Sequence, residues 1–160
     1  MVARSAAYEL LALPLAFTRV RTRLRVPRLL LREPVGAHNF SLSHRLTHSV
    51  LSGGVGLLGW FLAVLSVLVL VRGLAYPLVA ADGYQNSWGG PSLAGAWATH
   101  AVLGVLIAPL FGGMIAVFGR LQLRLTRTVL GGDRSWWAIP AAVVLAAFGG
   151  LFLVAWVRQI

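Results

Sequence analysis

The stretch from Leu93 to Arg120 constrains the fold of this chain more than any other part of it. It contains no charged residue before Arg120. At about 1.5 Å per residue, a helix of this length is more than long enough to cross a hydrocarbon core roughly 30 Å thick. We therefore predict a transmembrane helix over residues 93–119.

Two further runs have the same character. Residues 50–71 and residues 136–157 carry no charge, and Pro140 is tolerated because it falls in the first turns of its helix. The chain as a whole is only 11% charged, whereas ordinary soluble domains hold roughly a quarter of charged residues. The predicted fold is an all-α polytopic membrane protein with three transmembrane helices.

The first 48 residues form a polar, basic segment that precedes the membrane domain predicted for residues 49–160. From Arg19 to Val26, arginines alternate with Val, Thr and Leu, as they could in an edge strand. Read as a helix, the same stretch has an apolar stripe flanked by arginines, which is typical of an amphipathic helix in the headgroup plane. We favour two short interfacial helices with a break at Pro27; a solvated basic tail is the alternative.

The distribution of arginine predicts the orientation of the chain. Eight arginines lie in residues 1–48 and four in residues 120–134, whereas the other side has only Arg72 and Arg158. Positive charge gathers on the cytoplasmic side of membrane proteins, so we expect the N-terminus in the cytoplasm and the C-terminus outside, in the cell (inner or plasma) membrane. A cleaved signal peptide is not expected, because the arginine cluster follows the short apolar run of residues 10–17.

The arginines also predict a partner. Together with predicted spans, a net charge of +10 indicates anionic lipid headgroups and not nucleic acid. The residues assigned to headgroup contact are Arg19, Arg21, Arg23, Arg25, Arg28, Arg32, Arg120, Arg124 and Arg127.

Small residues recur at intervals of four in the last two spans. Such ridges allow helix backbones to approach closely within a bilayer. The predicted helix-packing interface consists of Gly104, Ala108, Gly112, Ala116, Ala142, Ala146 and Gly150. The start of the first span is also rich in small residues, namely Ser52, Gly53, Gly54, Gly56 and Gly59, and predicts close approach by a neighbour.

The ends of the predicted helices carry recognisable signals. Ser41 or Ser43 is a plausible N-cap for the first span. The second span should continue past the bilayer and stop at Gly131-Gly132. Asp133 or Ser135 could cap the third span.

Few side chains in this sequence are of the types that bind metals or take part in catalysis. His44 and His48 are four apart and could share a helix face for a metal, but no third ligand stands near them, so we predict neither metal nor cofactor. His100 lies about two turns into the second span. Bonding to a neighbouring helix or to the preceding loop is favoured there over a ligand or proton role.

The loop between the first two spans is the other candidate. Asp82, Tyr84 and Trp88, with His100, form a possible outer-face recognition site, and an equal alternative is a turn anchored by its aromatic residues. No paired acids, catalytic triad or phosphate-binding glycine loop can be assembled, so we do not expect an enzyme. With four acids in all, an ion or proton pathway is also disfavoured.

Several short motifs are shared with a known family. They are Tyr76-Pro77-Leu78, the loop from Asn86 to Pro91, the sequence from Leu93 to Trp97 running into His100, and the stretch from Leu123 to Arg127 with Leu130-Gly131. In these residues, about 59–131, the chain resembles the second membrane hairpin of the sensor domain at the N-terminus of many actinobacterial histidine kinases. A third span follows where the family has its kinase. The resemblance thus implies a sensor-like membrane module that acts through another protein.

Three functional hypotheses follow. The leading one is a non-catalytic accessory or regulatory subunit that packs against other transmembrane subunits of a larger envelope complex, with a lipid transporter as one host. The first alternative is an orphan membrane sensor module that signals to a separate kinase. The second is a small channel or transporter formed by self-association.

Overall fold

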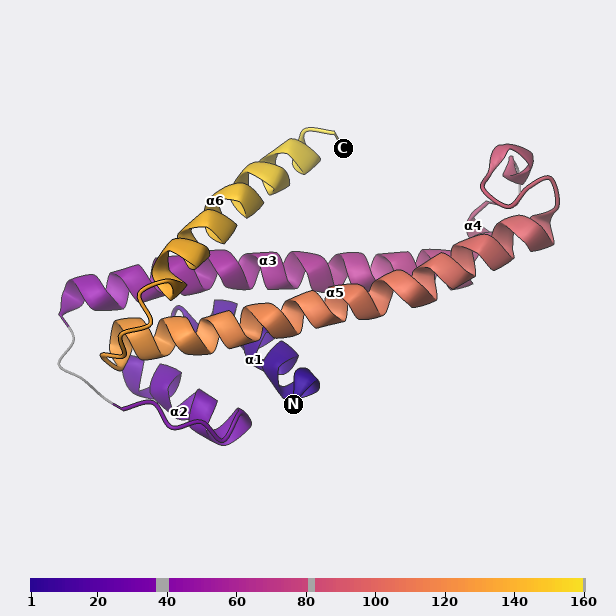
Figure 1. Ribbon diagram of the computed structural model, residues 1–160. Coiled ribbons are helices and arrows are strands. Elements are labelled where there is room, and N and C mark those ends of the chain that lie inside the picture. The colour runs from indigo at the N-terminus through magenta and orange to yellow at the C-terminus, as the bar shows by residue number, and fades with distance from the viewer. Residues whose placement is uncertain (37–40, 81–82, 160) are drawn as a thin grey trace. The chain divides into compact units, whose positions relative to one another are not determined.

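The computed structural model describes residues 1–36, 41–80 and 83–159, and over these residues the regular structure is helical (Figure 1). The elements are α1 (Val2–Leu15), α2 (Val20–Leu30), α3 (Leu42–Leu74), α4 (Tyr76–Val79), the 3-10 helix η1 (Tyr84–Asn86), α5 (Leu93–Leu130) and α6 (Ala138–Val157). Helices α3, α5 and α6 are each long and apolar enough to cross a membrane. The prediction of a helical chain with three such segments is therefore confirmed.

The long helices extend beyond two of the predicted spans. Helix α3 begins ahead of residue 50, and Ser41 immediately before it accepts a hydrogen bond from the backbone N–H of His44 at 3.5 Å, as expected of an N-cap. Helix α5 continues to Leu130, where the predicted glycine pair ends it. There Gly132 has a φ of +73°, and the backbone N–H of Asp133 donates to the Arg127 carbonyl at 3.0 Å.

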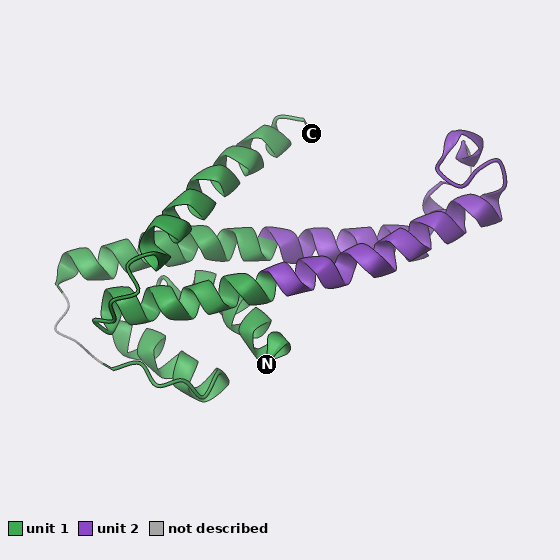
Figure 2. Cartoon of the chain, in the orientation of Figure 1, with its two compact units in different colours: residues 1–60, 115–160 green, residues 61–114 purple. Residues whose placement is uncertain are grey.

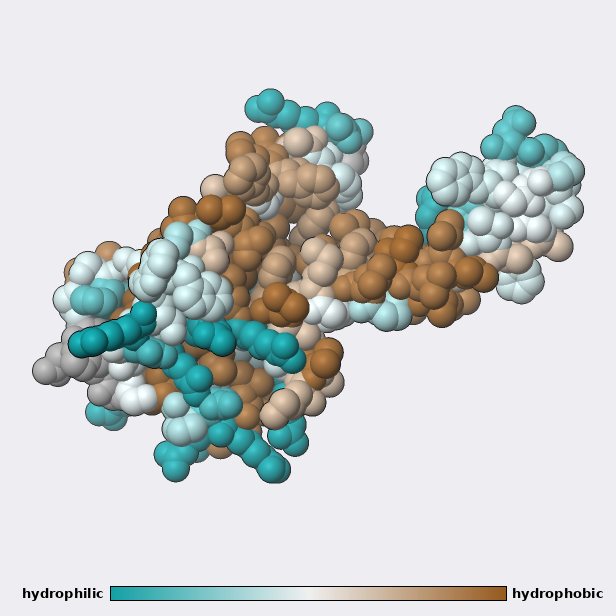
Figure 3. Space-filling view, viewed as in Figure 1, coloured by the Kyte–Doolittle hydropathy of each residue, from teal (hydrophilic) through white to brown (hydrophobic). Residues whose placement is uncertain are grey.

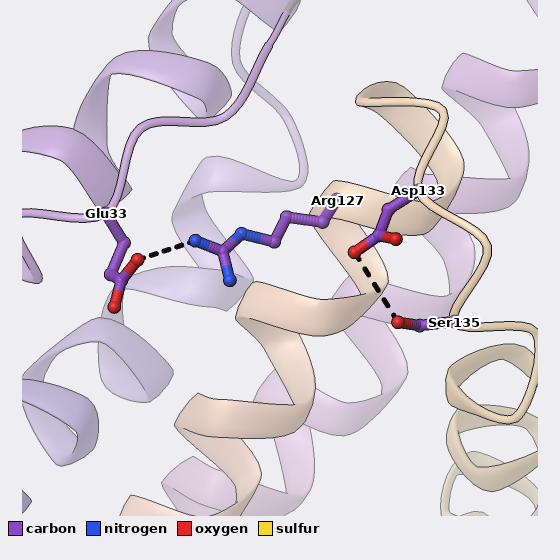
Figure 4. Close-up of polar contacts among 4 residues, drawn as sticks. All are labelled: Glu33, Arg127, Asp133 and Ser135. Atoms are coloured by element: carbon purple, nitrogen blue, oxygen red, sulfur yellow. Dashed lines mark hydrogen bonds and ion pairs between the residues drawn. The ribbon is translucent and has the colours of Figure 1, made fainter.

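The predicted cap of the third span is wrong. Helix α6 begins at Ala138 with Trp137 at the N-cap position, and no side chain caps it; Ser135 accepts the N–H of Ala138 only through its backbone carbonyl, at 3.0 Å. The Ser135 hydroxyl donates instead to the Asp133 carboxylate at 3.5 Å (Figure 4). The two candidate caps therefore bond to each other within the connection.

The arginine-rich stretch is helical, but its break is not at Pro27. Pro27 lies inside α2, and the two short helices are separated at residues 16–19 instead. Pro27 has no N–H to donate to the carbonyl of Arg23, so α2 continues through it with one intrahelical hydrogen bond fewer. The carbonyl of Pro27 still accepts the N–H of Leu31 at 2.9 Å.

The chain forms two compact units (Figure 2). Unit 1 comprises residues 1–60 and 115–160, and unit 2 comprises residues 61–114. Helices α3 and α5 run through both units. The apolar core of unit 1 consists of Leu51, Val55, Leu125, Val129, Leu130 and Ala142.

In unit 1, the glycine-rich start of α3 receives α1. A Cβ atom at Gly56 would lie 2.7 Å from the backbone nitrogen of Leu13, and one at Gly53 would lie 3.6 Å from the Cβ of Ala16. Helix α1 can approach so closely only because Gly56 has no side chain. The close neighbour that the sequence predicted for this face exists, and it is the short N-terminal helix.

In unit 2, α3 and α5 pack on each other through small residues. A Cβ atom at Gly104 would lie 2.9 Å from the carbonyl oxygen of Val69. The hydroxyl of Ser66 donates to the carbonyl of Ala108 at 3.2 Å, and the indole N–H of Trp97 donates to that of Leu74 at 3.0 Å. Gly104 and Ala108 thus serve packing within the chain.

The contact of α1 with α3 leads to a first prediction. Gly56→Ala should lower the free energy of unfolding by about 1–3 kcal/mol, because the added methyl meets backbone and not a flexible side chain. Thermal unfolding in detergent, followed by circular dichroism, measures the change. The matched control is Gly113→Ala, where a Cβ meets nothing within 4 Å. The control should be neutral or stabilise by up to about 1 kcal/mol. Equal effects of the two substitutions would contradict the packing described.

Candidate functional site

A group of buried polar side chains connects four helices of unit 1. Its members are Tyr8 and Glu9 of α1, Arg23 of α2, His48 of α3, and Gln122 and Thr126 of α5. Buried polar groups are costly unless they are hydrogen-bonded, so each donor and acceptor needs a partner. We call these six residues the buried polar network.

Arg23 joins α2 to the end of α1. Its guanidinium donates to the carbonyl of Ala16 at 2.7 Å and to that of Thr18 at 3.1 Å. A cation is favourable beside the carbonyls at the C-terminal end of a helix, where the helix dipole is negative. A third contact, of 3.3 Å, joins Arg23 to Nδ1 of His48.

These contacts determine which atoms donate in the rest of the network. Arg23 can only donate, so Nδ1 of His48 accepts and Nε2 carries the hydrogen. Nε2 then donates to the hydroxyl of Thr126 at 3.0 Å, while that hydroxyl donates to the carbonyl of Gln122 at 2.8 Å. Thr126 has no second hydrogen, so the hydroxyl of Tyr8, at 3.1 Å, must donate to it. Burial raises the pKa of Tyr8 to about 12, which keeps this donor protonated.

Glu9 and Gln122 form the unsatisfied end of the network. The side-chain nitrogen of Gln122 donates to the carbonyl of Ser52 at 2.9 Å, which leaves its Oε1 without a partner. Both carboxyl oxygens of Glu9 also lack a hydrogen-bond partner among the described residues. Glu9 is fully buried against α3, and a Cβ atom at Gly59 would lie 2.7 Å from its Oε1.

The environment of Glu9 favours its neutral form. Burial raises the pKa of Glu9 to about 8, and the Gln122 side chain, which makes no hydrogen bond of full geometry with the carboxyl, has a smaller lowering effect. The network can therefore hold a proton on a carboxyl group near neutral pH. Over the parts of the chain that the structure describes, no group of three His, Cys, Asp or Glu residues could hold a metal ion.

The two histidines that could have shared a helix face have different surroundings. His44 is exposed, and its Nδ1 lies 2.8 Å from the hydroxyl of Ser41. His48 is buried and bonded to Arg23 and Thr126. His48 belongs to the network, and His44 does not.

In unit 2, His100 supports the loop that precedes α5. Its ring stacks on Tyr76, with 4.1 Å between ring centroids, and its Nδ1 lies 2.8 Å from the carbonyl of Ala96. Tyr76 is buried and donates to the hydroxyl of Ser87 at 2.6 Å. The hydrogen bond is to Ala96 of the same helix, so the predicted bond to a neighbouring helix or to the preceding loop stays a prediction; what joins His100 to α4 is the stacking on Tyr76.

The other residues of the predicted recognition site are less enclosed. Trp88 is 77% exposed, and Tyr84 is half-buried in η1. Asp82 lies outside the described residues. The structure thus gives a loop anchored through Tyr76 that presents Trp88, and leaves the recognition role as a prediction.

The arginines assigned to lipid headgroups fall into two groups. Arg23 is only 7% exposed and is bonded to protein carbonyls, so its assignment to headgroups must be corrected. Arg127 forms an ion pair of 2.6 Å with Glu33 (Figure 4), and Arg124 lies 5.1 Å from the ring centroid of Trp137. Arg124 is exposed as well, as are the remaining six: Arg19, Arg21, Arg25, Arg28, Arg32 and Arg120.

Some small residues of the predicted helix-packing interface pack within the chain, and others have no neighbour there. Ala116 and Ala142 are buried in unit 1, and Ala146 faces Gly54, where a Cβ would lie 2.9 Å from its own. In contrast, a Cβ at Gly112 or Gly150 would meet nothing within 4 Å. Most of this interface therefore packs within the chain, and two of its positions are left open.

The surface of α6 is apolar over most of its length (Figure 3). Its exposed side chains include Val143, Val144, Phe148, Leu151, Val154 and Val157. Such a surface is suited to lipid or to another apolar helix.

Comparison of the chain with protein-family models, with curated proteins and with solved structures gives no match. The resemblance of residues 59–131 to the kinase sensor domain stays a prediction.

A second prediction tests the role of Thr126. Thr126→Val keeps the shape of the side chain but removes the acceptor of both the His48 N–H and the Tyr8 hydroxyl. Each buried donor left without an acceptor costs about 1–3 kcal/mol, so the loss of unfolding free energy should be large. The control is Thr22→Val at an exposed position of α2, which should change little.

A double-mutant cycle sharpens this test. Tyr8→Phe should cost less in the Thr126→Val background than in the native chain, because its hydrogen bond is already lost. Additive effects in denaturant unfolding would contradict the hydrogen bond between Tyr8 and Thr126.

Proposed function

We propose that the chain is a non-catalytic accessory or regulatory subunit that packs against other transmembrane subunits of a larger envelope membrane complex, such as a lipid transporter. Gly112 and Gly113 of α5 and Gly150 of α6 are the observation that supports it most directly. A Cβ atom added at any of them would meet nothing within 4 Å. Glycine in a helix is about 1 kcal/mol less favourable than alanine, and no contact among the described residues makes use of these missing side chains.

The other glycines of the long helices give the contrast. Gly56, Gly59 and Gly104 each lie where a Cβ would press on a neighbouring segment of the same chain. In a bilayer, small residues are useful where two helices meet, because they let the backbones and their packing surfaces come close. Glycines that are unused within the chain are therefore suited to a helix of another subunit.

The arginines support the placement that we propose in the membrane. Residues 1–48 and residues 120–134, which comprise the end of α5 and the chain that follows it, carry twelve of the fourteen arginines, which favours a cytoplasmic N-terminus in the cell (inner or plasma) membrane. The exposed arginines of α2 are Arg21, Arg25 and Arg28, and they lie on a helix suited to anionic headgroups in the interfacial plane.

Bulky substitutions at the open glycines test the proposal. Gly112→Leu and Gly150→Leu should leave the unfolding temperature nearly unchanged but remove a stoichiometric partner from the protein purified in mild detergent. Mass spectrometry of the purified complex makes the measurement. The matched control is Val117→Leu, at a position of α5 that is 58% exposed, and it should keep the partner.

Two outcomes would contradict the proposal. One is the absence of any stoichiometric partner of the native chain. The other is a pure homo-oligomer that Gly112→Leu dissociates, which would favour the self-associating channel or transporter. Gly104→Leu separates folding from assembly, because Gly104 packs within unit 2 and its replacement should lower the unfolding temperature.

A sensor that signals to a separate kinase is the second candidate, and the exposed Trp88 on its anchored loop favours it. If the loop detects a signal, Trp88→Ala should change the transcriptional response of the cell and leave the amount of folded protein unchanged. Trp136→Ala is the matched control, since Trp136 is 76% exposed in the other unit. A response that is unaffected by Trp88→Ala, as measured by RNA sequencing, would contradict the sensor hypothesis.

A further inference from the structure

The buried polar network contains hydrogen-bond acceptors that have no donor. The donors of Arg23, His48 and Tyr8 have acceptors: Arg23 donates to carbonyls and to His48, and His48 and Tyr8 both donate to Thr126. Among the described residues, three buried acceptor atoms remain without a donor, namely Oε1 and Oε2 of Glu9 and Oε1 of Gln122. If Glu9 carries a proton, its hydroxyl becomes a donor, and one hydrogen bond satisfies an atom on each side chain.

The amide atom of Gln122 that lacks a partner is its oxygen. Gln122 donates from its nitrogen to the carbonyl of Ser52, so the atom left over is the oxygen, which only accepts. An ionised Glu9 offers only acceptors as well. The Gln122 oxygen can therefore be satisfied by a neutral Glu9 but not by its carboxylate.

The groups packed around Glu9 do not neutralise a negative charge there. The other buried polar or titratable side chains of the four helices are Ser5 and Tyr8 of α1, Arg23 of α2, His48 and Ser52 of α3, and Gln122 and Thr126 of α5. Arg120 of α5 is exposed. The single cation of the network, Arg23, uses its donors on His48 and on backbone carbonyls, and α3 presents Gly59 to the carboxyl.

We propose that Glu9 is a proton-binding site, occupied when its neutral carboxyl donates a hydrogen bond to Oε1 of Gln122, and that loss of this proton releases α1 from α3 and α5. The packing of Glu9 couples its protonation to the position of α1. Glu9 lies against Gly59, in the same face of α3 where Gly56 meets Leu13. A carboxylate at this position must regain water, and it can do so only if α1 moves away.

The pH dependence has a definite sign. Burial raises the pKa of Glu9 from 4.5 to about 8, so the folded chain keeps this proton at pH values where the unfolded chain has lost it. Stability from this site is complete below the unfolded pKa and is lost as pH rises towards the folded one. The unfolding temperature should therefore fall between pH 4.5 and about 8.

The experiment uses the full chain in detergent, with three proteins: the native chain, Glu9→Gln and Glu33→Gln. Glutamine is isosteric with neutral glutamic acid and should preserve the fold. Glu33 is an exposed acid paired with Arg127, so Glu33→Gln is the matched control. Infrared spectroscopy monitors the carbonyl band of a protonated carboxylic acid, and thermal unfolding is measured over the same pH series.

We expect a carboxylic acid band near neutral pH in the native chain and in Glu33→Gln, and its absence in Glu9→Gln. The unfolding temperature of the native chain and of Glu33→Gln should fall from pH 4.5 to about 8, while the band persists, and should level off as the band disappears, whereas that of Glu9→Gln should lack this fall. A native chain without the band overturns the proposal, as does a native chain whose unfolding temperature does not fall over this pH range.

A small cation is the competing ligand for three unpaired oxygens. The series is therefore repeated with sodium replaced by choline at fixed pH. Equal unfolding temperatures support a proton as the ligand. A sodium-dependent rise in the native chain that is absent in Glu9→Gln overturns it in favour of a cation site.

Discussion

The contact of α1 with the glycine face of α3 is the interaction on which the buried polar network depends. Gly53, Gly56 and Gly59 leave room for the backbone of α1 and for the side chain of Glu9. Larger residues there would hold α1 away and would separate Tyr8 from Thr126. A close helix contact and a polar network are thus one structural feature, since the hydrogen bonds are possible only at the distance that the glycines permit.

Arg23 shows how the same residue type serves different physical roles in this chain. On the surface, arginines such as Arg21 and Arg25 are exposed, as an interfacial helix requires. Arg23, on the same helix, is directed at the carbonyls that end α1 and at His48. Its charge is balanced by helix carbonyls and not by an acid. Helix α2 is therefore fixed to the rest of unit 1 by a buried cation.

Parts of the candidate site could be predicted from the sequence, and its central part could not. The glycines of α3 predicted a close neighbour, which is α1. His100 was expected to bond to a neighbouring helix or to the loop, and it contacts Tyr76 by stacking instead. No sequence motif assigns a role to Glu9, although it is a lone acid inside an apolar stretch. Gln122 and Thr126 are four apart on α5, which is a weak signal for one polar helix face.

The sequence by itself determined the three long apolar helices, the end of α5 at the glycine pair, and the amphipathic character of α2. These properties follow from local composition and periodicity, which act within a helix. Only the tertiary structure decided that α1 packs on α3, that Arg23 is buried, and that Glu9 is buried against Gly59. The members of that network are separated by up to 118 positions along the chain, as Tyr8 and Thr126 are. No periodic pattern links such positions, because their contact is created by the packing of whole helices.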